Sequence, residues 1–255
     1  MLNLPDNWGG ISISQYLEIN ELIKLELPQT NYFIELISLL ADVPISDVEE
    51  LSYNEFMLCI KSLDFLQHKP NRQHSQSLAT KFGNLYFIES FNKLEIGAFI
   101  DLEHFFSIDY IGNLKTILAI LYRRKTFNDS PFILDEFEEY GDWIFHRESL
   151  FDEISILEVY NIIPAYFKFR EDFFEKYDGL LGGPVEDEEP IQGESIVSRS
   201  ERIKENERQK SINKWGWDMF LYQLANNDVS RINEATKINL VQAFNSLSMK
   251  RELGV

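Results

Sequence analysis

The stretch GDWIFHRESLFDEISILEVYNIIPAYFKFREDFFEKY, residues 141–177, is the densest run of aromatic and aliphatic side chains in the chain. Within it, Ser149 is followed three residues later by Asp152 and then by Glu153. Acidic side chains in a first helical turn are stabilised by the unpaired N–H groups there. The pattern predicts a central helix that begins at Ser149 and is covered on more than one face.

Pro164 interrupts this helical pattern, because proline lacks a backbone N–H and clashes with the carbonyl one turn earlier. We therefore expect a kink or a break near residues 162–164. The aromatic side chains of the stretch fit either a core or a surface that binds a partner. The partner-binding candidates here are Tyr160, Tyr166, Phe167, Phe169, Phe173 and Phe174.

The composition indicates a folded and strongly acidic protein. In a chain of 255 residues, 44% hydrophobic residues suffice for a sizeable core. The 42 acidic residues outnumber the 24 basic ones, which gives a net charge of −18. This charge repels phosphate groups and argues against direct binding to nucleic acid or to an anionic membrane.

Cys59 is the only cysteine, so an intrachain disulfide and a cysteine-based zinc site are excluded. The N-terminal residues lack a basic region followed by an apolar core, and no run approaches the roughly 20 apolar residues of a spanning helix. These features favour a protein of a reducing cytoplasm.

Residues 1–68 carry the signals of an N-terminal helical subdomain. Ser12 or Ser14 is expected to cap its first helix. Ser52 is expected to cap a later helix with one apolar side that faces the core. The side chains of that side recur at helical spacing and are Phe56, Cys59, Ile60 and Leu63.

Residues 69–177 are expected to hold a β-hairpin and the central helices. The polar stretch 69–80 is typical of an exposed loop. Residues 85–89 are rich in β-forming side chains and are expected to pair with residues around 93–95.

Helical periodicity returns at residues 96–106 and 113–123. Arg123, Arg124 and Lys125 follow the second of these helices. Their charges fit the negative end of the helix dipole, so we expect an ordinary capping role for them.

The C-terminal part changes in composition. Residues 178–199 contain two prolines, four glycines and an acidic run, which is typical of a flexible linker. Residues 200–255 are expected to form a helical hairpin, with a last helix at about 232–252. Trp215, Trp217 and Phe220 are further partner-binding candidates there.

Charge is unevenly distributed between these parts. Residues 199–255 hold ten Lys or Arg and seven Asp or Glu, whereas the rest of the chain is acidic. Opposite charges favour docking of residues 199–255 onto the acidic remainder of the chain or onto a neighbouring copy. The expected fold is mainly α with a small β-hairpin, as a multi-helix body plus a C-terminal helical hairpin.

No pattern in the sequence indicates a catalytic, cofactor-binding or metal-binding residue. The histidines match no zinc-binding spacing and are His68, His74, His104 and His146. The sequence contains neither a glycine-rich phosphate loop followed by lysine nor a Gly-x-Ser-x-Gly elbow. We therefore expect a non-enzymatic protein without a cofactor.

Several segments together resemble a known group of proteins. They are FIDLE at 99–103, NLKTILAILYR at 113–123, EYGD at 139–142, SILEVY at 155–160, and the stretch from Trp215 to Asp228. With LPDNW at 4–8, they resemble virion-region proteins of tailed phages of Bacteroidetes, including crAss-like phages. Those proteins are described as tail-assembly chaperones or structural proteins.

The resemblance implies a non-enzymatic virion assembly protein, a tail or connector chaperone or adaptor. Its partners would be other virion proteins or further copies of the chain, in the host cytoplasm during assembly or in the virion. Two alternatives remain open. The protein is a structural component retained in the particle as a ring, connector or cargo protein, or it is an acidic regulatory module that mimics nucleic acid.

Overall fold

The structure, a computed structural model, describes residues 2–126, 136–177, 180 and 215–254. The chain divides into two compact units. Unit 1 comprises Met1–Glu89 and Leu102–Phe167, and unit 2 comprises Ser90–Asp101 and Lys168–Val255.

The predicted division at residues 1–68, 69–177, 178–199 and 200–255 stays a prediction. Its linker lies outside the described residues apart from Leu180.

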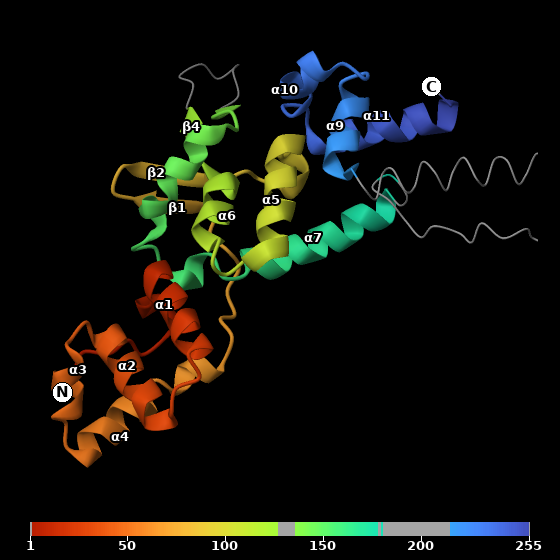
Figure 1. The fold of residues 1–255 in the computed structure, drawn as a ribbon. Coiled ribbons are helices and arrows are strands. Elements are labelled where there is room, and N and C mark those ends of the chain that lie inside the picture. Colours follow the sequence, from red (N-terminus) through yellow and green to blue (C-terminus); the bar gives the residue numbers. More distant parts are fainter. Residues whose placement is uncertain (1, 127–135, 178–179, 181–214, 255) are drawn as a thin grey trace, which may run out of the picture. The chain divides into compact units, whose positions relative to one another are not determined.

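The mainly α fold with a small β-hairpin is confirmed (Figure 1). Helices α5 (Ile96–Asp109) and α7 (Ile162–Lys176) each contribute residues to both units. The other helices of unit 1 are α1 (Ile13–Lys24), α2 (Gln29–Ala41), α3 (Ile45–Glu49), α4 (Tyr53–Ser62) and α6 (Leu114–Leu121). Those of unit 2 are α9 (Trp217–Leu224), α10 (Ile232–Ala235) and α11 (Leu240–Leu253).

Capping boxes start two of the N-terminal helices, as predicted. The Ser12 hydroxyl accepts from the N–H of Gln15 at the start of α1, and the Gln15 side chain accepts from the N–H of Ser12. Ser52 and Glu55 make the same reciprocal pair at α4. Cys59 of α4 is buried, so its predicted core position is confirmed.

The strand predicted at residues 85–89 pairs with other segments than predicted. Among the described residues, β1 (Ser77–Thr80), β2 (Gly83–Phe87) and β3 (Tyr122–Arg123) form an antiparallel sheet in that order. The predicted pairing with residues 93–95 is wrong, and β1 lies in the stretch predicted to be a loop. Only Leu78 of β1 is buried, so the strand has little apolar signal. Gly83, with φ of +110°, supplies the backbone conformation that the tight turn needs.

Helix α6 is shorter than predicted because the chain turns into strand β3 after Leu121. Arg123 is buried, yet it has the capping role predicted for it: its Nε donates to the carbonyl of Ile120, in the last turn of α6 (3.0 Å). The N–H of Arg124 donates to the Glu138 carboxylate (2.6 Å).

A second arginine, Arg147, is also buried and forms an ion pair with Glu138. The Glu138 carboxylate therefore neutralises a cation that is shielded from water. Such pairs contribute little net stability when intact, but removing one partner leaves a buried charge without compensation.

In unit 1, the residues at the start of α1 form backbone hydrogen bonds with residues 154–156. The N–H of Ile13 donates to the carbonyl of Ile154 (2.8 Å), and the N–H of Ile156 donates to the carbonyl of Ile11 (2.9 Å). These four side chains are buried as well. Backbone and side chains thus both fix the extended conformation at this point.

This pairing explains why the predicted start of the central helix at Ser149 is wrong. Residues Asp142–Phe151 form a 3-10 helix, η4, and the next helical turn is a short 3-10 helix, η5 (Ile156–Glu158). Between them the backbone hydrogen bonds are made with the chain before α1. The predicted break near residues 162–164 is confirmed: α7 begins at Ile162, and Pro164 lies in its first turn, where its missing N–H costs nothing.

The same arrangement occurs in unit 2. The N–H of Ile96 donates to the carbonyl of Ile238 (2.8 Å), and the N–H of Leu240 donates to the carbonyl of Leu94 (2.8 Å). The single helix predicted at 232–252 is therefore wrong, because this pairing separates α10 from α11.

The two pairings belong to a motif that occurs once in each unit. In each case a 3-10 turn, η1 (Trp8–Gly10) or η3 (Phe91–Lys93), precedes the extended residues and the long helix α1 or α5. Asn7 caps η1 and Ser90 caps η3 through their side chains.

The sequences of the two motifs are also alike. ISISQY at 11–16 corresponds to LEIGAF at 94–99, and ISILEVYN at 154–161 corresponds to INLVQAFN at 238–245. Apolar, small and aromatic positions coincide. Units 1 and 2 thus contain two versions of one supersecondary motif.

The Glu138→Ala substitution should destabilise the fold by about 3–5 kcal/mol, because it leaves buried Arg147 without its carboxylate. Urea unfolding followed by circular dichroism measures this change. The matched control is Glu153→Ala, since Glu153 pairs with Lys81 at the surface; it should cost less than about 1 kcal/mol. If both substitutions lowered the free energy of unfolding equally, the structural role of the Glu138–Arg147 ion pair would be contradicted.

The Asn239→Ala substitution should destabilise unit 2 by about 0.5–2 kcal/mol, because the Asn239 side chain accepts from two N–H groups at the start of α11. Thermal unfolding checks the loss. Gln242→Ala, at an exposed position of the same helix, is the control and should leave the transition unchanged within about 0.5 kcal/mol.

Candidate partner-binding surfaces

The nine aromatic residues predicted to bind a partner differ in exposure. Three are buried: Tyr166, Phe173 and Phe220. Four are partly buried: Tyr160, Phe169, Phe174 and Trp217. Phe167 is 42% exposed and Trp215 is 52% exposed. The side chains of the three buried residues fill the units, and a partner-binding role stays a prediction for all nine.

The aromatic residues of unit 2 form its core. The ring of Phe244 is fully buried and lies 4.8 Å from Phe173 and 4.7 Å from Phe220, centroid to centroid. Trp217 lies 5.6 Å from Phe220 on α9. The regular helical spacing of these residues therefore reflects core packing, the alternative left open by the sequence.

In unit 1, by contrast, aromatic rings reach the surface where the ends of α5 and α7 meet. The ring of Phe106 stacks on Tyr166 at 4.3 Å and meets the edge of Phe167 at 5.2 Å. Tyr110, 36% exposed, lies 5.8 Å from Phe167. The Tyr166 hydroxyl donates to Glu103 (2.8 Å), which fixes the ring that supports the exposed pair.

A second group of rings in unit 1 is partly buried beside α1. Tyr16 lies 6.2 Å from Trp8 and 6.2 Å from Tyr160, both in edge contacts, and Trp8 lies 5.7 Å from Phe65. The Trp8 indole donates to the carbonyl of His68 (2.7 Å). Burial raises the pKa of Tyr16, and the neighbouring phenols Tyr160 and Tyr110 raise it further.

We call these rings the aromatic strip of unit 1. Its members are Trp8, Tyr16, Phe65, Phe106, Tyr110, Tyr160 and Phe167. Half-exposed aromatic side chains with few rotatable bonds lose little entropy on binding and are enriched among interface hot spots. The sequence identified only Tyr160 and Phe167, because the other members come from segments far apart along the chain.

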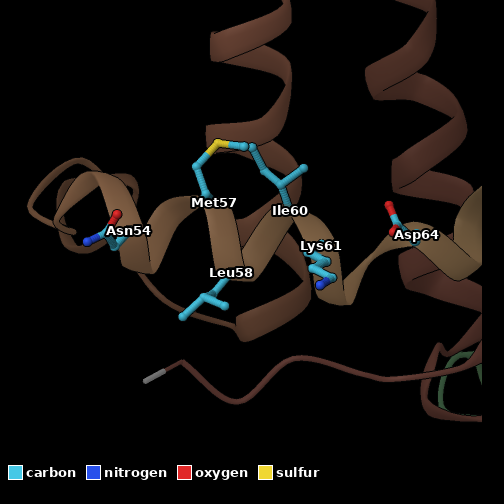
Figure 2. Close-up of a pocket in the computed structure, with 6 residues that line it drawn as sticks. All are labelled: Asn54, Met57, Leu58, Ile60, Lys61 and Asp64. Atoms are coloured by element: carbon cyan, nitrogen blue, oxygen red, sulfur yellow. The ribbon is translucent and has the colours of Figure 1, made fainter.

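A groove lies along α4 (Figure 2), with a volume of about 680 Å³. The side chains that line it are Asn54, Met57, Leu58, Ile60, Lys61 and Asp64. Figure 2 shows Met57 and Ile60 pointing to the same side of α4, with Asp64 beyond the helix end. Met57 is 44% exposed and Leu58 is 49% exposed. The sequence analysis missed this second apolar side of α4.

The part of the chain that bears the groove is strongly acidic. Residues 1–68 contain eleven Asp or Glu, and only Lys24 and Lys61 are basic. The groove therefore combines apolar contact area with an acidic surrounding, which suits a partner segment that is apolar and basic.

Within residues 2–126, 136–177 and 215–254, no group of three or more His, Cys, Asp or Glu is placed to hold a metal ion. In the same part, no helix combines the length and the apolar character that crossing a membrane requires.

Comparison with known proteins found no matching protein-family model, no similar curated protein and no similar solved structure.

His74 is the histidine whose environment is most distinctive. Its ring meets the edge of Phe87 at 4.7 Å, and its Nε2 is buried without a hydrogen-bond partner among the described residues. Burial lowers the pKa of His74 below its usual value. The folded state therefore favours the neutral ring.

Because the folded pKa of His74 is lowered, the unfolded chain binds the His74 proton more readily. This residue's contribution to stability should be complete above its unfolded pKa of about 6.5 and should be lost as the pH falls through the lower folded pKa. Urea unfolding between pH 7.5 and pH 5 should show a smaller loss for His74→Gln than for the wild type. If the wild type and His74→Gln lost the same stability between pH 7.5 and pH 5, protonation of His74 would not contribute to the pH dependence of unfolding. His104→Gln, at an exposed position, is the control.

Proposed function

We propose that this protein is a non-enzymatic bacteriophage virion assembly protein, a chaperone or adaptor for the tail or connector that acts through protein–protein contacts. The observation that carries the proposal is the aromatic strip of unit 1. Its exposed end, Phe167 and Tyr110, packs on Phe106, which in turn stacks on buried Tyr166.

The geometry of the strip supports binding to a protein rather than to a small molecule. The rings come from η1, α1, the 3-10 helix η2 (Asp64–Gln67), α5 and α7, and from residues that follow α5 and η5, so the strip gathers side chains from segments far apart along the chain. Such a surface can bury several aromatic side chains at once against a partner, which is how most interface free energy is gained.

The phage context rests on the resemblance of segments such as FIDLE at 99–103 and SILEVY at 155–160. It implies that the partner is another virion protein and that binding occurs in the host cytoplasm during assembly. A structural component retained in the particle would use the same kind of contacts.

Proteomics of purified particles and of infected-cell lysate tests this proposal. Capture of a virion protein with the tagged chain from lysate, with the chain absent from particles, would support a transient chaperone. Stoichiometric presence in particles would support a structural component. Failure to co-purify with any virion protein in either sample would contradict both.

A second candidate is an acidic module that mimics nucleic acid, favoured by the surplus of acidic residues in 1–68. Such a mimic binds a basic partner mainly through charge. Its complex should weaken steeply with rising salt, whereas a complex anchored by the aromatic strip should depend on salt much less.

The double substitution Tyr110→Ser and Phe167→Ser should weaken partner capture at least about tenfold, because both rings are exposed anchors. Both positions are exposed, so the fold should be retained, as circular dichroism can check. Titration of the captured partner by isothermal calorimetry measures the change. Val229→Ser is the matched control, since Val229 is 70% exposed on η6 (Val229–Arg231) of unit 2 and does not belong to the strip. Unchanged affinity of the double variant would contradict the role of the strip.

A further inference from the structure

Helix α4 packs one apolar side against the interior of unit 1, and it also carries apolar side chains on its outer side. Cys59 and the following Leu63 are each 3% exposed and face the interior of unit 1. Elsewhere on the helix, Tyr53 is 77% exposed, and Met57 and Leu58, which both line the groove, are 44% and 49% exposed. Exposed apolar side chains gathered along a groove indicate a docking site rather than scattered surface residues.

The groove carries charges of both signs at one end. Lys61 lies on the last turn of α4, and Asp64 lies just beyond the helix. An occupant of the groove should therefore present an apolar ridge with one basic and one acidic side chain next to it.

The C-terminal end of α11 has these features. Met249 is 56% exposed and Leu253 is 67% exposed, and residues four apart lie on one side of a helix. Lys250 and Glu252 flank this ridge, and Lys250 and Arg251 make the last turn of α11 basic. Lys250 is held in place by hydrogen bonds to the carbonyl of Gln223 (3.1 Å) and to Asn226 (2.6 Å).

Charge favours contact between these two surfaces. The region that bears the groove, residues 1–68, contains eleven acidic and two basic residues, whereas the last turn of α11 carries the basic Lys250 and Arg251 beside one acidic residue, Glu252. Ridge and groove also match in size, since each offers two or three large apolar side chains along about one helical turn.

We propose that the protein associates head to tail: the α11 ridge of one copy, Met249 and Leu253, docks in the α4 groove of another copy, against Met57 and Leu58. Lys250 then faces Asp64, and Glu252 faces Lys61. Because the two surfaces differ, a dimer still has one free groove, on one copy, and one free ridge, on the other, so the contact propagates into a ring or an open chain. This proposal uses other residues than the aromatic strip and does not rest on it.

The small apolar area on each side implies a weak contact, with a dissociation constant on the order of 10 μM or above. Sedimentation-velocity analysis of the full chain between about 1 and 300 μM spans that range. The wild type should pass from monomer to larger species as the concentration rises. A wild type that stays monomeric throughout overturns the proposal.

Two single-surface variants then test which residues make the contact. The groove variant is Met57→Glu with Leu58→Glu, and the ridge variant is Met249→Glu with Leu253→Glu. Each variant alone should weaken association at least about tenfold. All four positions are exposed, so the variants should fold, which circular dichroism verifies before sedimentation.

Mixing the two variants separates a head-to-tail contact from any other arrangement. The groove variant keeps an intact ridge and the ridge variant keeps an intact groove, so the mixture should form a one-to-one dimer with the wild-type dissociation constant and no larger species. A mixture that stays monomeric overturns the proposal, as does association that survives in either variant alone.

Matched controls complete the experiment. Ile23→Glu with Val229→Glu places the same charges at other exposed apolar positions and should leave association unchanged. The strip variant Tyr110→Ser with Phe167→Ser should also associate normally. If the strip variant alone abolishes association, self-contact runs through the strip, and the ridge-and-groove proposal is wrong while binding by the strip is retained.

Discussion

Two short backbone pairings organise this protein. In unit 1 the residues before α1 pair with those before η5, and in unit 2 the residues before α5 pair with those before α11. Each pairing satisfies backbone groups that would otherwise be buried without partners, and each brings large aliphatic side chains into a core. Helix starts are thereby fixed by partners more than a hundred residues away in the sequence, so the long-range contacts and the local structure form together.

The motif built around each pairing occurs twice, but its surroundings differ. In unit 2 the aromatic side chains of α7, α9 and α11 pack on Phe244 and close a core. In unit 1 the corresponding position is Tyr160, which is only partly buried and continues into the aromatic strip. One arrangement of aromatic residues therefore serves stability in one unit and provides a candidate binding surface in the other.

The acidic residues of this chain have two different roles in the structure. Residues 1–68, which include α4, hold eleven acidic and two basic residues, while partly buried Glu138 takes a structural role beside Arg147. Exposed carboxylates select a basic partner and speed its approach, whereas the apolar side chains of the groove supply contact area. The two contributions are separable because they lie on different side chains.

The sequence by itself determined the helical class, the caps at Ser12 and Ser52, the buried Cys59 and the break at Pro164, because each depends on neighbours within about one or two helical turns. Only the tertiary structure decided that the chain turns at residues 152–153 and pairs at Ser155 with the segment before α1, that Ser77–Thr80 is a strand and that α10 and α11 are separate. The same holds for the candidate surfaces. Phe173 and Phe167 have similar sequence surroundings, yet one is buried against Phe244 and the other is exposed, because burial depends on which distant segments pack against a side chain.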